Sequence, residues 1–541
     1  MVVRLTSPDT AARGADGVTL AADVLVIGGG LAGGWAAIAA ARAGASVILV
    51  EKGYFGASGV TATAGPGHWW VPPDPAGARS QAIAQRNARA LGLGDPRWME
   101  RIIDLTWRTL PTLAPYYDFP TNEAGVTQFR GLRGPEYLRA LRRLASDLGV
   151  RILDHHPALE LVADPDGAVV GAKGLRRQAG GDWLVRAGGV VLATGGCAFR
   201  SRLLGAHNNT GDGLLMGAEA GAELSGMEFS SYYTVAPART TMTRSMSYGF
   251  ARYFDADGRR LEIAPGPDVT RALAAALLRG PVLCSLEDTP QDIRAVMPQV
   301  QPNFMLPFDR MGVDPYRDRF EITLTGEGTV RGVGGLRLAD DDGGVGVPGL
   351  YAAGDTASRE PVAGANSGGG AQNSAWALST GAWAGEAAAR FARRPTARRM
   401  SRGEGLGRVG LRPARRAGAV APGEIEGAVK AEMLPYDKTV FRSGPRLARS
   451  LETLEEAWKA SRDHLGDGAA DRLRSREAAA MAAAARWCCT SALARNESRG
   501  MHQRTDAPAS DPRLARRLRL RGVDRILVLP ERTVGREEIL P

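Results

Sequence analysis

The chain has 541 residues, which is more than one compact core usually holds, so two or three domains are expected. Its 44% apolar and 23% charged content is that of an ordinary globular protein, and no run of eighteen apolar residues predicts a membrane span. The net charge of +10 raises the question of a nucleic-acid partner. The sequence has no RNA- or DNA-reading motif, and we expect no nucleic-acid partner. Four cysteines without a CxxC pattern predict no metal or iron–sulfur site, and with the polar, leaderless residues 1–19 they indicate a disordered lead and a cytoplasmic protein.

The first predicted elements are a strand at 23–27, a glycine-rich turn, a helix at 35–43 and a strand at 46–50 that ends in Glu51. The turn has the spacing Gly28-x-Gly30-x-x-Gly33, and this order of elements is typical of a dinucleotide-binding βαβ unit. Gly28 permits the tight turn, Gly30 lets the backbone approach a pyrophosphate, and Gly33 lets helix and strand pack closely. Glu51 is placed to accept hydrogen bonds from a ribose diol.

The α/β pattern continues to about residue 228. A Gly/Pro/Trp-rich loop at 56–75 precedes helices, which are expected at 76–92, 97–114, 135–148 and 213–222. Strands are expected at 150–153, 158–163, 168–177 and 188–193, and the last of them ends in Thr194-Gly195-Gly196.

The pattern changes at 229–325, where aromatic residues, Met and Pro predict an inserted domain. A strand at 349–352 then leads into Gly354-Asp355, and a helix is expected at 375–391. The arginine-rich stretch 393–423 is interpreted as a solvated linker, with an arm for an anionic partner as the alternative. Helical periodicity covers 424–505, where Cys488-Cys489 are either small helix-core residues or a redox pair, and the tail 506–541 holds one strand candidate at 525–529.

In order and spacing, these blocks resemble the FAD-binding blocks of the fumarate reductase/succinate dehydrogenase flavoprotein superfamily, which includes aspartate oxidase and adenylylsulfate reductase. The resemblance extends through Thr210–Gly213, Gly226–Phe229, Ala371–Ala375 and Glu497–His502. It implies an α/β fold with a Rossmann-like FAD-binding domain at 20–228 and 326–392. It also implies an inserted α+β capping domain at 229–325 and a C-terminal helical domain at 424–505.

The resemblance implies contacts to FAD. Asp355 suits a ribityl hydroxyl, Gly65 leaves room at flavin N5, and the helix that Asn373 and Ser374 open points its dipole at the flavin N1–C2=O edge. The full predicted set is Gly28, Gly30, Gly33, Glu51, Lys52, Ser58, Gly65, Thr194, Gly195, Asp212, Gly354, Asp355, Asn373 and Ser374. The family's histidine for a covalent flavin bond is missing from residues 57–61, so noncovalent FAD is expected.

The sequence departs from the family where dicarboxylates are bound. Tyr233 replaces one histidine and Val330 another, Ser367 replaces the clamp arginine, and Pro267-Asp268 fall where a proton-shuttling arginine is expected. Bidentate arginines are what grip carboxylates in such sites, so succinate, fumarate and aspartate are poor substrate candidates.

The catalytic candidates are therefore Tyr233, Arg331, Arg244 and His68. A tyrosine hydroxyl can donate a proton, the arginines can anchor an anion, and His68 can line the substrate pocket. The alternatives are a packing role for Tyr233 and His68 and a solvated surface role for the arginines. His502 is expected at an ordered helix end near the active-site entrance and not as a base.

We expect an FAD-dependent oxidoreductase that moves a hydride between a small organic substrate and flavin N5. Two alternatives stay open: an FAD-holding electron-transfer subunit with an iron–sulfur or ferredoxin-like partner, and a fumarate reductase/aspartate oxidase-like enzyme with an altered substrate site. FAD chemistry on nucleic acid, suggested by the basic linker, is a further alternative. Oxygen, a quinone or an iron–sulfur protein could reoxidise the flavin.

Overall fold

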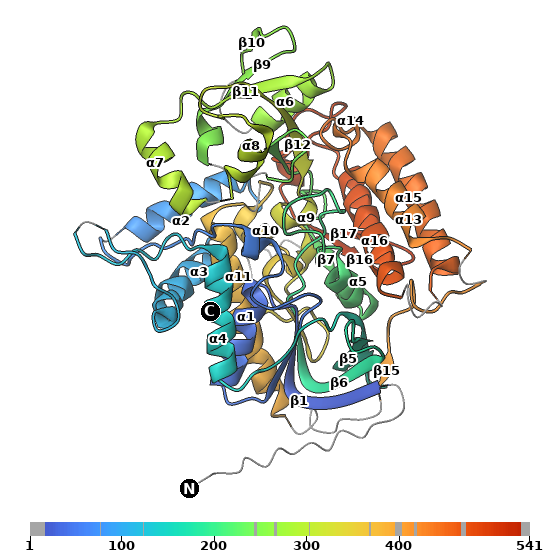
Figure 1. The fold of residues 1–541 in the computed structure, drawn as a ribbon. Helices are drawn as coiled ribbons and strands as arrows, with labels where there is room; N and C mark the ends of the chain where they lie inside the picture. Colours follow the sequence, from blue (N-terminus) through green and yellow to red (C-terminus); the bar gives the residue numbers. More distant parts are fainter. Residues whose placement is uncertain are drawn as a thin grey trace, which may run out of the picture.

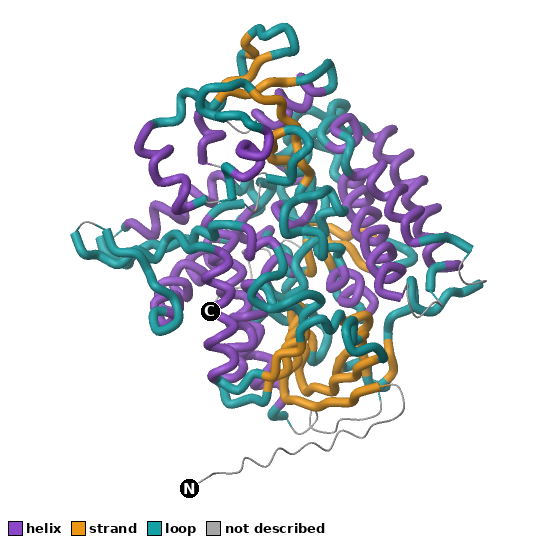
Figure 2. The backbone as a smooth tube through the Cα atoms, viewed as in Figure 1, coloured by secondary structure: helices purple, strands orange, loops and turns teal. Residues whose placement is uncertain are grey.

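The chain forms three units (Figures 1 and 2). The computed structural model describes residues 17–75, 77–122, 124–242, 246–263, 268–301, 303–366, 369–394, 403–415, 419–466 and 472–531. In Figure 1 an α/β unit lies at the bottom left, a capping unit at the top, and a bundle of C-terminal helices at the right.

A mixed sheet of eight strands forms the centre of the α/β unit, in the order β15-β4-β5-β6-β1-β2-β3, with β14 also paired to β6. The strands are β1 (Gly17–Ile27), β2 (Val47–Val50), β3 (Arg151–Leu153), β4 (Ala158–Ala163), β5 (Val169–Leu175), β6 (Asp182–Leu192), β14 (Leu350–Ala352) and β15 (Glu404–Gly405). β1, β2, β3, β6 and β14 pair in parallel, so their carboxyl ends meet at one edge. Val24–Ile27 and β2 are almost fully buried, as expected of strands covered on both faces.

Six helices of the described residues belong to this unit, and some of them pack on the sheet while the others pack on those helices. The six are α1 (Leu31–Arg42), α2 (Ala78–Arg89), α3 (Pro96–Thr109), α4 (Gly134–Asp147), α5 (Asp212–Glu219) and α11 (Ala371–Ala392). α11 packs on α1 at very short range, because a Cβ at Gly381 would lie 2.3 Å from the carbonyl oxygen of Ala32, and one at Gly385 would lie 2.1 Å from that of Ala36. Two helices distant in sequence thus form one layer beside the glycine-rich turn.

The capping unit has its own antiparallel sheet, in the order β10-β9-β11-β12-β8, and its own hydrophobic core. Its strands are β8 (Tyr233–Pro237), β9 (Arg252–Phe254), β10 (Arg260–Leu261), β11 (Val282–Ser285) and β12 (Phe320–Gly326). Its helices are α6 (Val269–Leu277), α7 (Gln291–Val300) and α8 (Leu306–Met311). Two short helices then lead the chain back, α9 (Gly328–Arg331) before β14 and α10 (Glu360–Ala363) after it.

The C-terminal unit is helical, with α13 (Pro422–Met433), α14 (Tyr436–Thr439), α15 (Gly444–His464) and α16 (Arg472–Ala494). The tail adds a hairpin, β16 (Leu518–Arg521) and β17 (Leu527–Pro530), to β7 (Leu224–Ser225) and β13 (Gly335–Leu336). No helix in the described ranges has the length and apolar character needed to cross a bilayer.

The mixed α/β fold and the helical C-terminal region are as the sequence predicts, and four details differ. Residues 17–19 belong to β1 and pair with β6, so the lead cannot be disordered as far as residue 19. α1 begins at Leu31 and α11 at Ala371, each four residues earlier than expected. The tail holds a hairpin instead of one strand, and its first strand, β16, has a Leu-Arg-Leu-Arg alternation of only four residues.

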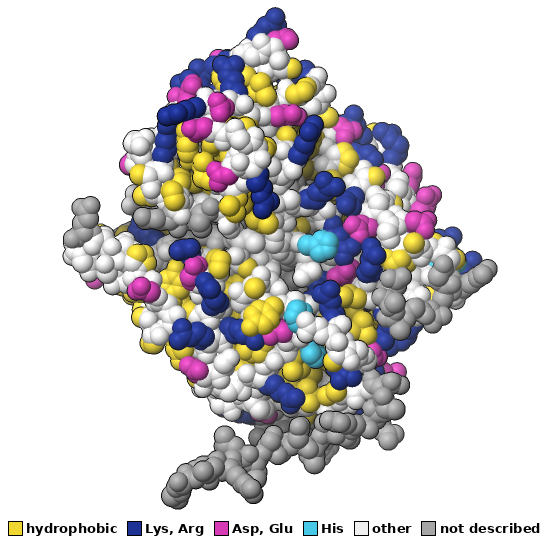
Figure 3. All heavy atoms as spheres, viewed as in Figure 1, with side chains coloured by type: hydrophobic (Ala, Val, Ile, Leu, Met, Phe, Trp, Pro, Cys, Tyr) yellow, Lys and Arg dark blue, Asp and Glu magenta, His cyan; other side chains and the backbone are white. Residues whose placement is uncertain are grey.

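The largest difference from expectation concerns the arginine-rich stretch, which was expected to be a solvated linker. β15 pairs with β4, and both terminal nitrogens of Arg412 bond the buried carboxylate of Glu160 at 2.8 Å. Arg398, Arg399, Arg402 and Arg416 lie outside the described residues. On the face shown in Figure 3, Lys and Arg side chains are dispersed among acidic ones over all three units. The described residues on this face therefore form no single basic surface for a polyanion.

Candidate cofactor-binding site

A cavity of about 320 Å³ opens where the carboxyl ends of β1, β2, β6 and β14 meet. Of the fourteen residues predicted to hold FAD, all except Gly33 line it. Gly33 is turned away from the cavity and packs on the turn, since a Cβ there would lie 1.8 Å from the carbonyl oxygen of Gly28. The structure therefore brings these thirteen residues, from six separate regions of the sequence, into one concave surface.

The glycine-rich turn has the shape of a phosphate cradle. Gly28 has φ of 105°, and a Cβ there would lie 2.4 Å from the carbonyl oxygen of Ala193, so only glycine fits. At Gly30, in contrast, no atom lies within 4 Å of the position that a Cβ would occupy. Because Gly30 also precedes the first residue of α1, this open space lies at a helix N-terminus, which suits an anionic group.

Glu51 and Lys52 line the next part of the wall. The Glu51 carboxylate accepts hydrogen bonds from the backbone N–H groups of Gly29 at 2.6 Å and Gly53 at 2.7 Å, which fix its orientation. The Lys52 ammonium binds Asp212 at 2.6 Å and Glu477 at 2.9 Å. Burial opposes the charge of Lys52, but the two carboxylates outweigh it and raise the pKa of the lysine. Lys52 thus ties the cavity wall to α16.

The other end of the cavity meets the N-terminus of α11. Gly370 is the N-cap, and Asn373 and Ser374 lie in the first turn of this 22-residue helix. The N–H groups at the start of α11 and the helix dipole favour a negative partial charge in the cavity. Asn209 also lines the wall, and its buried side-chain oxygen has no hydrogen-bond partner in the described structure. Both features fit a polar cofactor such as FAD.

The four catalytic candidates fall in different places. Arg331, at the end of α9, lines the cavity, whereas Arg244 lies outside the described residues. Tyr233 does not line the cavity: its hydroxyl is 2.9 Å from the carbonyl oxygen of Leu434 and 2.5 Å from Oγ1 of Thr439. Burial raises the pKa of Tyr233, so it stays neutral within the packing between the capping and helical units.

His68 lies behind the cavity wall instead of lining it. It is 2% exposed, and its Nε2 is 3.2 Å from the hydroxyl of Tyr137, which in turn accepts a hydrogen bond from Trp35 on α1. Burial lowers the pKa of His68 to about 3, so the ring is neutral at physiological pH. The adjacent Trp70 stacks with Trp107 at a ring-centroid distance of 4.3 Å. This loop is a packed support of the glycine-rich turn.

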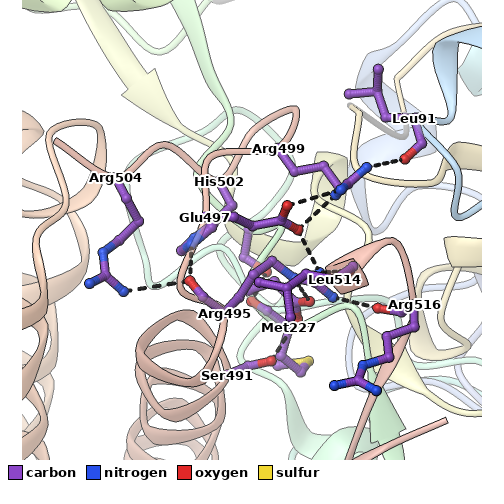
Figure 4. Close-up of polar contacts among 12 residues, drawn as sticks. Leu91, Met227, Ser491, Arg495, Glu497, Arg499, His502, Arg504, Leu514 and Arg516 are labelled. Carbon is purple, nitrogen blue, oxygen red and sulfur yellow. Dashed lines mark hydrogen bonds and ion pairs between the residues drawn. The ribbon is translucent and has the colours of Figure 1, made fainter. Parts of the chain in front are cut away.

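The Glu497–His502 block closes a buried ion-pair network beyond α16 (Figure 4). Arg495 binds Glu228 at 2.7 Å and Glu497 at 3.0 Å, and Arg499 binds Glu497 at 2.7 Å. His502 Nδ1 is 2.7 Å from Arg442, which can only donate, so this nitrogen is the acceptor. Burial and neighbouring arginines lower the pKa of His502, and the ring holds the chain without acting as a base.

Two residues near the cavity escaped the sequence analysis. Arg359, 1% exposed, forms an ion pair with Asp355 and donates to carbonyl groups of residues 329–332. Glu327, fully buried, contacts Arg331. The spacing of four residues between Asp355 and Arg359, and between Glu327 and Arg331, was the available signal. All four cysteines are buried and free, and the described residues hold no cluster of side chains suited to a metal ion.

Three families match the chain in succession. "FAD dependent oxidoreductase" matches residues 23–203, "FAD binding domain" matches 123–372, and "Fumarate reductase flavoprotein C-term" matches 431–518. L-aspartate oxidase of Mycobacterium tuberculosis is 29% identical over 93% of this chain and 96% of its own length. A fumarate reductase (CoM/CoB) chain of Methanothermobacter marburgensis is 26% identical over 92% of this chain and 96% of its own length.

Solved structures share the fold. A mutant FrdA of E. coli quinol fumarate reductase superposes with a TM-score of 0.79 at 21% identity, covering 94% of this chain and 96% of that one. Adenylylsulfate reductase of Archaeoglobus fulgidus superposes with a TM-score of 0.76 at 17% identity, covering 99% of this chain and all of the other. At these identities the likeness concerns the fold, including the capping and helical units.

Proposed function

We propose that this protein moves a hydride between a small organic substrate and N5 of a noncovalently held FAD. The chain belongs to the fumarate reductase/succinate dehydrogenase flavoprotein superfamily and is an FAD-dependent oxidoreductase. The observation that carries this proposal is the single cavity lined by thirteen of the fourteen expected FAD contacts. The bound flavin supplies the two-electron chemistry, and the protein supplies binding, orientation and electrostatics.

The proposed binding roles follow from the groups along the wall. Gly28, Gly30 and the N-terminus of α1 would hold the pyrophosphate, and Glu51 would hold the adenosine ribose. Asp355 would bind the ribityl chain. The N-terminus of α11, with Asn373 and Ser374, would stabilise the negative charge that the flavin gains on reduction.

Noncovalent attachment is supported by two facts. Residues 57–61 contain no histidine, and His68 is held behind the wall by Tyr137. Acid precipitation of the holoprotein should therefore release all the flavin into the supernatant. A yellow, fluorescent protein pellet would contradict this part of the proposal.

After each turnover the flavin has to return to its starting redox state, so electrons must be exchanged with a second reactant. We propose an external acceptor, with an iron–sulfur or ferredoxin-like protein, a quinone and oxygen as the candidates. Four free thiols suit a reducing compartment, which supports a cytoplasmic location. We expect no role for nucleic acid.

The test is anaerobic. The purified holoprotein is mixed with candidate reductants and oxidants, and the visible absorbance of the flavin is followed. Bleaching by one class of organic compound, and recovery with an acceptor, would support a dehydrogenase or reductase. If only a protein partner changes the absorbance, the alternative of an electron-transfer subunit without its own substrate is favoured. A purified chain that retains no FAD under any condition would overturn the proposal.

A further inference from the structure

Arg331 stands out among the charged side chains along the cavity. Lys52, the other strong cation of the described lining, is saturated by Thr210, Asp212 and Glu477. Arg331 is 24% exposed, and its one ion pair joins Nε to Glu327 at 3.5 Å. Among the described residues, neither terminal nitrogen of Arg331 has a hydrogen-bond partner. The cavity therefore contains one guanidinium whose two-pronged end is open.

The carboxylates along the wall do not compete for this end. Asp212 is paired with Lys52 and Asp355 with Arg359, while Glu51 accepts two backbone N–H groups. Within the described part of the chain, the ion pair of Arg331 is with Glu327 and approaches only from the Nε side. An oxyanion that enters the cavity would meet a donor pair of matching geometry.

Glu327 fixes the direction of Arg331. Its side chain is fully buried, and its other carboxylate oxygen accepts a short hydrogen bond from the hydroxyl of Thr234 on β8. Its backbone N–H donates to the carbonyl group of Tyr232 at 2.8 Å. The carboxylate is thereby held from the capping unit, and it holds the guanidinium in turn.

Arg359 fixes the helix that carries Arg331. α9 has only four residues, so the carbonyl groups of Thr329 and Val330 have no following helical turn to bond. Arg359 donates to the carbonyl oxygens of Thr329 at 2.9 Å and Val330 at 3.0 Å, and also to that of Gly332. The same guanidinium binds Asp355, one of the expected FAD contacts. One buried side chain thus connects the cofactor wall to the anion-facing helix.

We propose that Arg331 is the specificity-determining residue of the cavity and binds a single oxyanion of the substrate, a carboxylate, sulfonate or phosphate, through its two terminal nitrogens. Glu327 and Arg359 are positioning residues for this contact. The inference rests on the proposed function, because it assigns the substrate end of a cavity that FAD also occupies. It names a substrate class with one gripped anionic group.

Small probes test the contact without knowledge of the substrate. FAD-loaded wild type, Arg331→Gln and Arg331→Lys are titrated with acetate, sulfate and uncharged acetamide, and the change in the flavin absorbance spectrum is recorded. Thermal shifts of the apoprotein with the same probes give a readout independent of the flavin. We expect R331Q to weaken acetate and sulfate binding by about tenfold or more. R331K should have an intermediate effect, because lysine keeps the charge but lacks the paired terminal nitrogens of arginine. Neither substitution should change the binding of acetamide.

Three outcomes overturn the proposal. Unchanged acetate and sulfate affinity in R331Q removes the anion contact, and so does an acetamide response as strong as the acetate response. Loss of FAD by a stably folded R331Q assigns the guanidinium to the cofactor instead. The thermal shifts of the apoprotein measure anion binding without FAD. If the wild type binds no FAD, the proposed function is refuted, and the anion contact of Arg331 is still tested by these shifts.

Arg359→Lys tests the positioning role. A lysine can still meet Asp355 but cannot reach three carbonyl groups at once, so FAD should be retained while acetate affinity falls about threefold to tenfold. In the double variant R331Q/R359K the acetate affinity should match that of R331Q alone. Arg486→Lys is the matched control, because Arg486 is equally buried and also binds carbonyl groups, at Val523 and Asp524. R486K should leave acetate affinity unchanged, and additive effects of R331Q and R359K would refute the positioning role.

Discussion

The arginines of the ion-pair network in Figure 4 and Arg331 at the cavity differ in how their nitrogens are used. Arg495 is 1% exposed and spends every nitrogen on Glu228, Glu497 or the carbonyl groups of Leu514 and Arg516. Arg331 has one loose ion pair. A buried arginine with every nitrogen bonded joins chain segments, whereas one with unbonded terminal nitrogens at a cavity is available to a ligand. Counting arginines in the sequence does not separate the two kinds.

The strongest test of this comparison is Arg495→Met. Removing the guanidinium leaves Glu228 and Glu497 buried with fewer partners, so the free energy of unfolding should fall by about 3–5 kcal/mol. Denaturant unfolding measures it. Arg513→Met is the control, because its 89% exposed side chain pairs only at the surface and should cost less than about 1 kcal/mol. Equal losses in the two variants would contradict a structural role for the network.

Two glycines of the glycine-rich turn show a similar contrast, because Gly33 is packed against backbone and Gly30 faces open space. Gly33→Ala forces a methyl group against the carbonyl group of Gly28 and should cost about 1–3 kcal/mol of stability. Gly30→Ala meets no neighbouring atom and should preserve the fold, yet weaken FAD retention because the methyl group occupies the phosphate space. Thermal unfolding of the apoproteins and flavin content per chain separate the effects. A fully flavin-loaded G30A would contradict the assigned cradle.

The network also predicts a pH dependence. Glu360 is fully buried beside Glu228, and burial with this like charge raises its pKa to about 8. In the unfolded chain its pKa is near 4.5, so between these values the folded state binds more protons and stability falls as the pH rises. Glu360→Gln should remove this dependence and be about 1–2 kcal/mol more stable than wild type near pH 8.5. Parallel stability curves for the two proteins from pH 5 to 9 would refute the assignment.

Tyr233→Phe gives the smallest expected effect. The hydroxyl bonds Leu434 and Thr439 away from the cavity, so its loss should cost about 1 kcal/mol and leave the rate of flavin reduction unchanged. Stopped-flow absorbance with a substrate from the anaerobic screen measures the rate. A slowed reduction would return Tyr233 to the reacting centre.

The proposed FAD contacts that line the cavity could be predicted because each of them belongs to a short motif that can be recognised on its own. Gly28–Gly33, Glu51 and Gly354-Asp355 each end a predicted strand, and parallel strands bring such ends together. The start of α11 was missed because the small residues there blur the helical periodicity, and β16 was missed because its Leu-Arg alternation covers only four residues.

The substrate half depends on side-chain direction, which a single sequence does not reveal. Side chains alternate along β8, so Tyr233 points to α14 and the neighbouring Thr234 points to Glu327. The contacts of Arg359 with α9 join separate segments through carbonyl groups, and no residue type marks a carbonyl group that needs a partner. His68 had the right chemistry for a site, and only burial shows that it supports the wall.

The close packing of α11 on α1 also bears on how the protein is made. α1 and most of the sheet leave the ribosome early, and the whole capping unit follows before β14 and α11 emerge. Until then the wall formed by Gly354, Asp355 and Ser374 does not exist, and the apolar face of α1 that receives Gly381 and Gly385 is bare. Cofactor loading is therefore a late event in biogenesis, and a nascent chain that stalls within the capping unit exposes an unfinished core to chaperones and proteases.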